Sequence, residues 1–288
     1  MQVEHPRRMG KSTHRRVPQF QSPVPSPQSR FPIPDSRFPI PDTWPDLTGG
    51  RPVWWPPAAD RIQHLQGTFT LRFSMLTTDE VPLSQSALLV VDAQDSFKVG
   101  PRWERRNNRQ FERNVSALID AYRAAGLPVI FFLHTDGDPG FERDSVHLRL
   151  MDFIQPRTDE PVMLKDTRNA FTSTTLQVKL LTLGVRRLAV TGISMEQCCE
   201  TTTRVAADLG YAVDFVIDGT MTFPIPNHDV PGEEIGVDAI EERTAYALRR
   251  RFARIVQTKT LVAEVEALIE SAAMQQALQP ALQPAFAS

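Results

Sequence analysis

Four polar side chains follow short apolar runs of the chain, and their types together could perform nucleophilic catalysis. Asp92, His134 and Lys165 each end or directly follow such a run, and Cys198 comes shortly after a fourth. A cysteine thiolate is a nucleophile, a carboxylate can take the thiol proton, and an ammonium can stabilise the charges that develop. The combination of Asp92, Lys165 and Cys198 therefore favours chemistry based on a cysteine nucleophile.

The elements that must position these residues alternate along the chain. Short apolar runs, typical of strands buried on both faces, lie at 87–92, 128–133, 162–164, 187–191, 213–217 and 253–257. Helical stretches separate or follow them at 108–125, 174–183, 196–209, 233–251 and 261–274. This order predicts an α/β fold, a three-layer α/β/α domain with a mostly parallel, doubly wound six-stranded sheet. Ligands of such sheets bind beyond the carboxyl ends of the strands, where the four polar residues would meet.

The first 74 residues have a different composition from the rest. They hold 13 of the 24 prolines, and one heptapeptide occurs unchanged at 29–35 and 36–42. Dense proline removes backbone donors and opposes both helix and sheet. We therefore expect a disordered leader at 1–74, one folded α/β domain at 75–275 and a disordered tail at 276–288. A ligand for an aromatic-grooved domain and a nucleic-acid arm are alternatives for the leader.

Charge and cysteine content exclude several classes of protein. Residues 1–74 carry ten Lys/Arg against five Asp/Glu, a net charge of +5. Since the whole chain has a net charge of −2, residues 75–288 have a net charge of −7. That acidic body disfavours nucleic-acid binding. Two adjacent cysteines exclude a disulfide-stapled secreted scaffold. No apolar run is long enough for a membrane span, and no signal-peptide pattern begins the chain. We expect a cytoplasmic protein without membrane partners.

Three blocks of sequence resemble one family. Asp92-Ala-Gln94-Asp-Ser-Phe97 is similar to the D-x-Q-x-x-F opening of the isochorismatase-like cysteine hydrolases, which include nicotinamidases and N-carbamoylsarcosine amidases. The segment 165–171 followed by 175–176 resembles their K-x-x-x-[SN]-A-F…T-x-L block. The segment 191–202 resembles their T-G-x-x-x-x-x-C-V-x-x-T block. The likeness covers about residues 85–262, and the three blocks occur in the family's order.

The resemblance implies a role for each matched residue. Cys198 falls on the nucleophile, Asp92 on the general base and Lys165 on the cationic third member. It also implies a cis peptide before Ser194, with the amides of Ser194 and Cys198 forming an oxyanion hole. A position at the start of a helix would lower the pKa of Cys198 through the positive helix end.

Further residues are expected to line a substrate pocket. Nicotinamidases hold a metal with an Asp-x-His and a further His, an order that His134, Asp136 and Asp138 lack. We therefore expect no metal and no cofactor, with the two aspartates forming a turn. The expected pocket residues are Gln94, Phe97, Trp103, His134, Asn169, Phe171, Met195 and Phe223.

The function predicted is hydrolysis of a small non-peptide amide or related C–N bond through a Cys198 thioester. Retention of the cysteine favours acyl transfer over the vinyl-ether cleavage of isochorismatases proper. A catalytically silent or regulatory binding protein on the same fold is the alternative. Nucleotide binding is disfavoured because no strand leads into a glycine-rich phosphate loop. The resemblance also implies a homo-oligomer.

Overall fold

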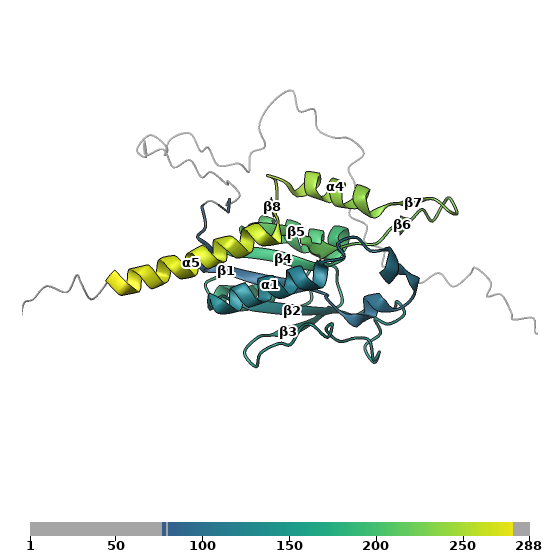
Figure 1. The fold of residues 1–288 in the computed structure, drawn as a ribbon. Coiled ribbons are helices and arrows are strands. Elements are labelled where there is room, and N and C mark those ends of the chain that lie inside the picture. Colours follow the sequence, from purple (N-terminus) through teal and green to yellow (C-terminus); the bar gives the residue numbers. More distant parts are fainter. Residues whose placement is uncertain (1–76, 79, 279–288) are drawn as a thin grey trace, which may run out of the picture. The chain divides into compact units, whose positions relative to one another are not determined.

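One parallel sheet organises the part of the chain that the computed structural model describes, residues 77–78 and 80–278. Its strand order is β3-β2-β1-β4-β5-β8, and every neighbouring pair runs parallel (Figure 1). The order reverses between β1 and β4, as in a doubly wound sheet. The strands are β1 (Ser86–Val91), β2 (Val129–His134), β3 (Val162–Lys165), β4 (Arg187–Ile193), β5 (Ala212–Met221) and β8 (Arg254–Val256).

Helices cover both faces of the sheet. In β1, Leu88 and Val90 face a core shared with α1 (Phe111–Ala124) and α5 (Thr258–Leu278), which lie side by side (Figure 1). The alternating Leu89 and Val91 face the other core, shared with α2 (Leu176–Thr182), α3 (Glu200–Asp208) and α4 (Val237–Leu248). Because successive strand side chains point to opposite faces, a strand covered on both sides must be apolar throughout. The predicted three-layer α/β/α fold is confirmed.

Two predicted helical stretches differ in the structure, and three short helices were not predicted. The stretch expected at 196–209 is a π-helical turn, Met195–Cys199, followed by α3. The stretch expected from 233 begins at Val237, because the preceding residues form a short antiparallel hairpin of β6 (Ile225–Pro226) and β7 (Glu234–Ile235). Short 3₁₀ helices at Leu83–Gln85, Asp95–Lys98 and Pro101–Arg105 were not predicted, since three to five residues leave no periodic signal.

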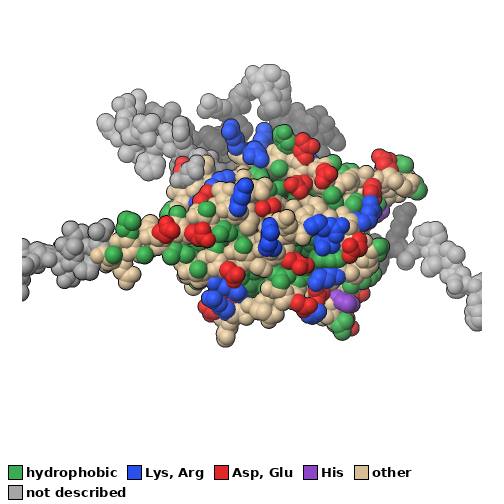
Figure 2. Space-filling view, viewed as in Figure 1, with side chains coloured by type: hydrophobic (Ala, Val, Ile, Leu, Met, Phe, Trp, Pro, Cys, Tyr) green, Lys and Arg blue, Asp and Glu red, His purple; other side chains and the backbone are tan. Residues whose placement is uncertain are grey.

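The ends of the chain are described only in part. The leader predicted at 1–74 lies outside the described residues. Helix α5 continues through Leu278, so the first three residues of the tail predicted at 276–288 are helical. Among the described helices, none is both long and apolar enough to cross a membrane. Figure 2 shows basic and acidic side chains interspersed on the face that carries α1 and α5.

Candidate active site

The side chains of Asp92, Lys165 and Cys198 meet at the carboxyl edge of the sheet. Asp92 follows β1, Lys165 ends β3, and Cys198 lies in the turn after β4. Lys165 Nζ is 2.7 Å from Asp92 Oδ2 and 3.4 Å from Cys198 Sγ. All three residues are at most 4% exposed. The strand-end pattern therefore predicted a cluster that the fold does bring together, next to the β1–β4 switch in strand order.

The backbone around the cluster takes unusual conformations. Asp92 has a φ of +50°, in the left-handed region that few residues other than glycine adopt. Gly192 has a φ of +126°, and a Cβ there would lie 1.8 Å from the Val91 carbonyl oxygen, so only glycine fits between β4 and β1. The peptide bond Ile193–Ser194 is cis, as the family resemblance implied.

Two backbone amides at the turn that carries Cys198, those of Ser194 and Cys198, make no hydrogen bond to a carbonyl outside the turn within the described residues. The carbonyl oxygen of Ser194 accepts hydrogen bonds from the amides of Gln197, at 3.2 Å, and Cys199, at 3.1 Å. The Ser194 and Cys198 amides are the donors that the predicted oxyanion hole would use.

Hydrogen bonds and ion pairs to neighbouring elements also hold the turn that carries Cys198. Glu200, the first residue of α3, is buried, and its Oε1 accepts a hydrogen bond from Arg204 Nη2 at 2.8 Å. Its other oxygen pairs with Arg243 of α4. Glu196 Oε2 accepts a hydrogen bond from Thr222 Oγ1 at 2.5 Å, which ties the turn to the end of β5. These contacts hold the residues on both sides of Cys198.

Lys165 is a charged group inside a protein interior. Burial alone would lower the pKa of Lys165, but Asp92 and Cys198 beside it raise the pKa above its usual value. Its Nζ also lies 3.1 Å from the Thr167 carbonyl oxygen and 3.3 Å from His134 Nδ1. Within the described structure, the Asp92 oxygens accept no directed hydrogen bond, so charge alone holds this carboxylate.

The electrostatics of Cys198 differ from the prediction. Burial and the nearby Asp92 carboxylate raise the pKa of Cys198 to about 12, although Lys165 opposes the shift. The expectation that a helix end lowers this pKa is wrong, because Cys198 lies in a buried π turn ahead of α3 and faces a carboxylate. At rest Cys198 is a neutral thiol, and its proton must leave as the sulfur attacks.

This protonation state predicts how Cys198 responds to an alkylating reagent. Only the thiolate reacts, and below the pKa its fraction rises about tenfold per pH unit. We expect the iodoacetamide labelling rate of Cys198, followed by peptide mass, to rise in this way from pH 7 to pH 9 without a plateau. Cys198→Ala should stay unlabelled, because Cys199 is fully buried. A plateau below pH 7.5 would contradict the raised pKa.

The donor set does not suit a metal ion. One donor atom each of Asp92, His134 and Cys198 lies within 4.8 Å of the others. However, Lys165 Nζ is within 3.4 Å of all three residues, so an ammonium already occupies the position of a cation. Asp136 and Asp138 form a turn, in which Asp136 Oδ1 accepts the Asp138 amide at 2.9 Å.

Comparison with known proteins identifies the family. The model of the isochorismatase domain matches residues 86–235, just over half of the chain. The chain belongs to the isochorismatase family. The isochorismatase family protein YrdC of Bacillus subtilis, itself uncharacterized, is 27% identical over 180 residues, covering 62% of this chain and 95% of its own. Nicotinamidase 3 of Arabidopsis thaliana is 31% identical over 159 residues, covering 50% and 77%.

Solved structures agree with this assignment. A putative hydrolase of the isochorismatase family from Chromobacterium violaceum superimposes with a TM-score of 0.59 and 27% sequence identity, covering 67% of this chain and 98% of the other. The family predicted from the three sequence blocks is therefore confirmed. This isochorismatase-family chain is a hydrolase.

Three of the residues predicted to line the pocket make specific contacts with neighbouring segments. Gln94 clamps β2, because its Oε1 accepts the His134 amide at 2.6 Å and its Nε2 donates to the His134 carbonyl at 2.9 Å. Asn169 closes a local turn by accepting the Phe171 amide at 3.0 Å. Phe171 packs 5.9 Å from Tyr211, in the layer of α2 and α3.

The other predicted pocket residues pack against aromatic rings, the core or charged groups. Phe97 and Phe223 stack at 5.7 Å, although they come from segments after β1 and β5. Trp103 lies under the Arg106 guanidinium at 4.1 Å, and Met195 is fully buried in the core beside Cys198. His134 contacts Lys165 and also pairs with Asp136, Nε2 to Oδ2, at 3.0 Å.

Sequence reasoning missed three residues of this region. Arg168 pairs with Asp136 at 3.1 Å and contacts His134, so it adds a positive charge three residues after Lys165. Phe141 packs against Phe97 at 5.0 Å, and Arg102 lies against both rings. Arg168 stands inside the 165–171 block and could have been noted, whereas nothing in the sequence marks Arg102 or Phe141.

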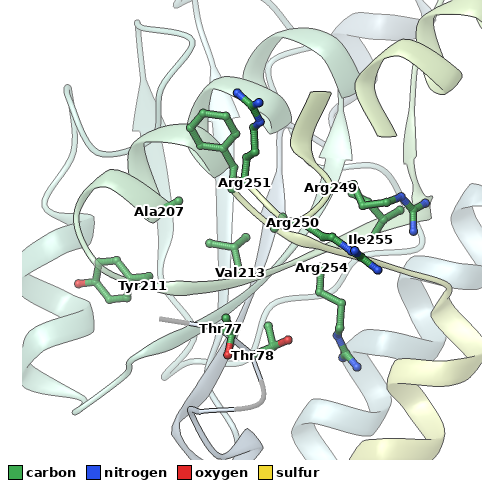
Figure 3. Close-up of a pocket in the computed structure, with 12 residues that line it drawn as sticks. Thr77, Thr78, Ala207, Tyr211, Val213, Arg249, Arg250, Arg251, Arg254 and Ile255 are labelled. Atoms are coloured by element: carbon green, nitrogen blue, oxygen red, sulfur yellow. The ribbon is translucent and has the colours of Figure 1, made fainter. Parts of the chain in front are cut away.

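A cavity at another place in the domain has different chemistry. It has a volume of about 360 Å³ and lies beside the start of β5 and the turn before β8 (Figure 3). Tyr211 and Val213 line it, together with arginines at 249, 250, 251 and 254. Its described lining contains no cysteine, histidine or carboxylate, so it lacks the residue types of a cysteine-hydrolase site. The hydrolytic site of this family member is therefore sought at Cys198.

Proposed function

We propose that the protein is an amidase-type cysteine hydrolase, which cleaves a small non-peptide amide or related C–N bond through a thioester on Cys198. The observation that carries this proposal is the contact of one buried ammonium, Lys165 Nζ, with both the Asp92 carboxylate and the Cys198 sulfur. The similarity to Nicotinamidase 3 supports an amide as the bond that is cleaved.

In the first half-reaction, the sulfur of Cys198 attacks the amide carbon while Asp92 takes the thiol proton. Because burial and Asp92 raise the pKa of Cys198, the thiol proton has to be transferred to Asp92 for the sulfur to attack. Lys165 stays protonated and stabilises the anionic sulfur during the transfer. The carbonyl oxygen becomes an oxyanion and accepts hydrogen bonds from the Ser194 and Cys198 amides.

Collapse of this intermediate breaks the C–N bond, and the leaving nitrogen takes the proton from Asp92. The resulting thioester is then attacked by water, whose proton passes to the same carboxylate. The acid product leaves, and the proton returns to the Cys198 sulfur. The net reaction converts one amide and one water into one carboxylic acid and one amine or ammonia.

The test is incubation of the full chain with a panel of small primary amides, followed by measurement of ammonia release and of intact protein mass. We expect ammonia release and, on rapid acid quench, a mass increase equal to the acyl group on the Cys198 peptide. Turnover without any covalent intermediate in the wild type, and undiminished in Cys198→Ala, would contradict the mechanism. Ligand binding without turnover would instead favour the silent binding protein.

A further inference from the structure

Three phenylalanine rings surround the guanidinium of Arg102. The Arg102 Cζ atom lies 5.2 Å from the Phe97 ring centre, 5.3 Å from that of Phe141 and 5.7 Å from that of Phe223. The three rings come from separate segments, after β1, after β2 and after β5. Attraction of the cation to these ring faces holds the guanidinium in one place.

The charge of Arg102 has no close counter-ion. Within the described residues, no carboxylate oxygen lies within 4.0 Å of its nitrogens. Its Nη2 makes one long hydrogen bond, 3.4 Å, to the Ser96 carbonyl oxygen, and its Nε is shielded from solvent without a partner. Buried donors are ordinarily satisfied, so an unpaired guanidinium nitrogen in a fixed position indicates a ligand that supplies the acceptor.

Two nearby arginines have the carboxylate partner that Arg102 lacks. Arg105, in the same 3₁₀ helix, pairs with Glu234, and Arg168 pairs with Asp136 at 3.1 Å. Burial lowers the pKa of Arg102, while the more distant Asp138 and Asp136 carboxylates raise it. Those aspartates favour the charged guanidinium without occupying its hydrogen-bond donors.

The caged guanidinium lies beside the candidate catalytic cluster. Phe141 contacts both sides, because its ring is also 6.2 Å from the His134 ring. His134 Nδ1 is in turn 3.3 Å from Lys165 Nζ. Phe97 follows Asp92 by five residues, and Phe223 follows the end of β5 by two. Arg102 therefore stands over the same carboxyl edge of the sheet as Cys198.

A guanidinium with free donors matches a carboxylate, which accepts two parallel hydrogen bonds from it. We propose that Arg102 binds a carboxylate group of the substrate, so that the substrate is a small amide that also carries a carboxylate. This inference rests on the proposed amidase function and narrows its substrate class. The phenyl rings would exclude water from the ion pair and pack against the carbon chain between the two groups.

The first experiment compares charged and neutral substrates of the same size. The ratio of kcat/KM for succinamate over butanamide, and for glutaramate over pentanamide, is measured by ammonia release. We expect the wild type to favour the carboxylated amides by about 10- to 100-fold, the range of hydrogen bonds to charged groups. Arg102→Gln and Arg102→Met should bring the ratio close to one. Arg102→Met keeps an apolar side chain packed among the three rings, so it removes the charge while preserving the packing.

The matched control is Arg105→Gln, the same substitution three residues away at an exposed arginine. It should keep the wild-type ratio. A wild type that prefers the neutral amides, or an unchanged ratio in both Arg102 variants with a folded circular dichroism spectrum, would overturn the proposal.

A binding measurement separates this inference from the proposed function. Malonate, succinate and glutarate are titrated calorimetrically into Cys198→Ala and into Cys198→Ala/Arg102→Gln. We expect one of the three to bind the first protein at least about tenfold more tightly than the second. If no amide is hydrolysed but this difference is found, the amidase function fails and the carboxylate site stands. If none of the three binds, or both proteins bind equally, the carboxylate site is overturned.

Discussion

Replacement of Cys198 by alanine is expected to lower kcat/KM by about 10⁴-fold or more on any amide that the wild type hydrolyses. In the proposed mechanism the Cys198 sulfur forms the covalent bond to the substrate, while Lys165 stabilises the sulfur and Asp92 moves the protons. Loss of the nucleophile therefore removes the whole covalent route and not one contribution to it. Ammonia release under substrate-saturating and substrate-limiting conditions measures the effect.

Cys199 supplies the matched control for this variant. It is the neighbouring residue and the same residue type, but it is fully buried in the core with no contact to Lys165 Nζ within the described structure. We expect Cys199→Ala to keep kcat/KM within about threefold and to lose about 1 kcal/mol of stability from the smaller side chain. A severe activity loss in Cys199→Ala, with normal activity in Cys198→Ala, would move the nucleophile by one residue.

The cluster was predictable because its geometry follows from strand ends. Apolar runs fix where β1, β3 and β4 stop, although the edge strand β3 exposes Val162 and Leu164, and parallel strands stop at the same edge of the sheet. Asp92 and Lys165 therefore had to meet near Cys198 whatever the loops did. Successive side chains of a strand point to opposite faces of the sheet, which places Leu88 in one core and Leu89 in the other. Because this alternation depends only on neighbouring residues, the layers were predictable as well.

The directions of loop side chains were not predictable in the same way. Gln94 stands in the family motif as a polar group, yet its amide is used by the backbone of His134, 40 residues away. The cage of Arg102 needs three rings from three loops, and no spacing in the sequence encodes their meeting. The raised pKa of Cys198 likewise depends on how deeply the sulfur is buried and on its distance from Asp92, which the sequence does not give.

Replacement of Lys165 by methionine is expected to lower the free energy of unfolding by about 3–5 kcal/mol at pH 7. Lys165 and Asp92 are both fully buried at 2.7 Å, so loss of the ammonium leaves a charged carboxylate without its partner and without water. Methionine has a similar length and fills the space, which separates the loss of charge from the loss of packing. Urea unfolding of the full chain, followed by far-ultraviolet circular dichroism, measures the change.

A second substitution shows whether the unpaired charge is the cause. Asp92→Asn removes the charge and tolerates the left-handed backbone at this position, where φ is +50°. We expect Asp92→Asn/Lys165→Met to be at least about 2 kcal/mol more stable than Lys165→Met alone, because the buried pair contributes a coupling energy that neither single variant retains. Lys259→Met, at an exposed lysine of α5, should change stability by less than about 0.5 kcal/mol. Equal stability of the single and double variants would mean that the buried Asp92 carboxylate is satisfied by a group other than Lys165.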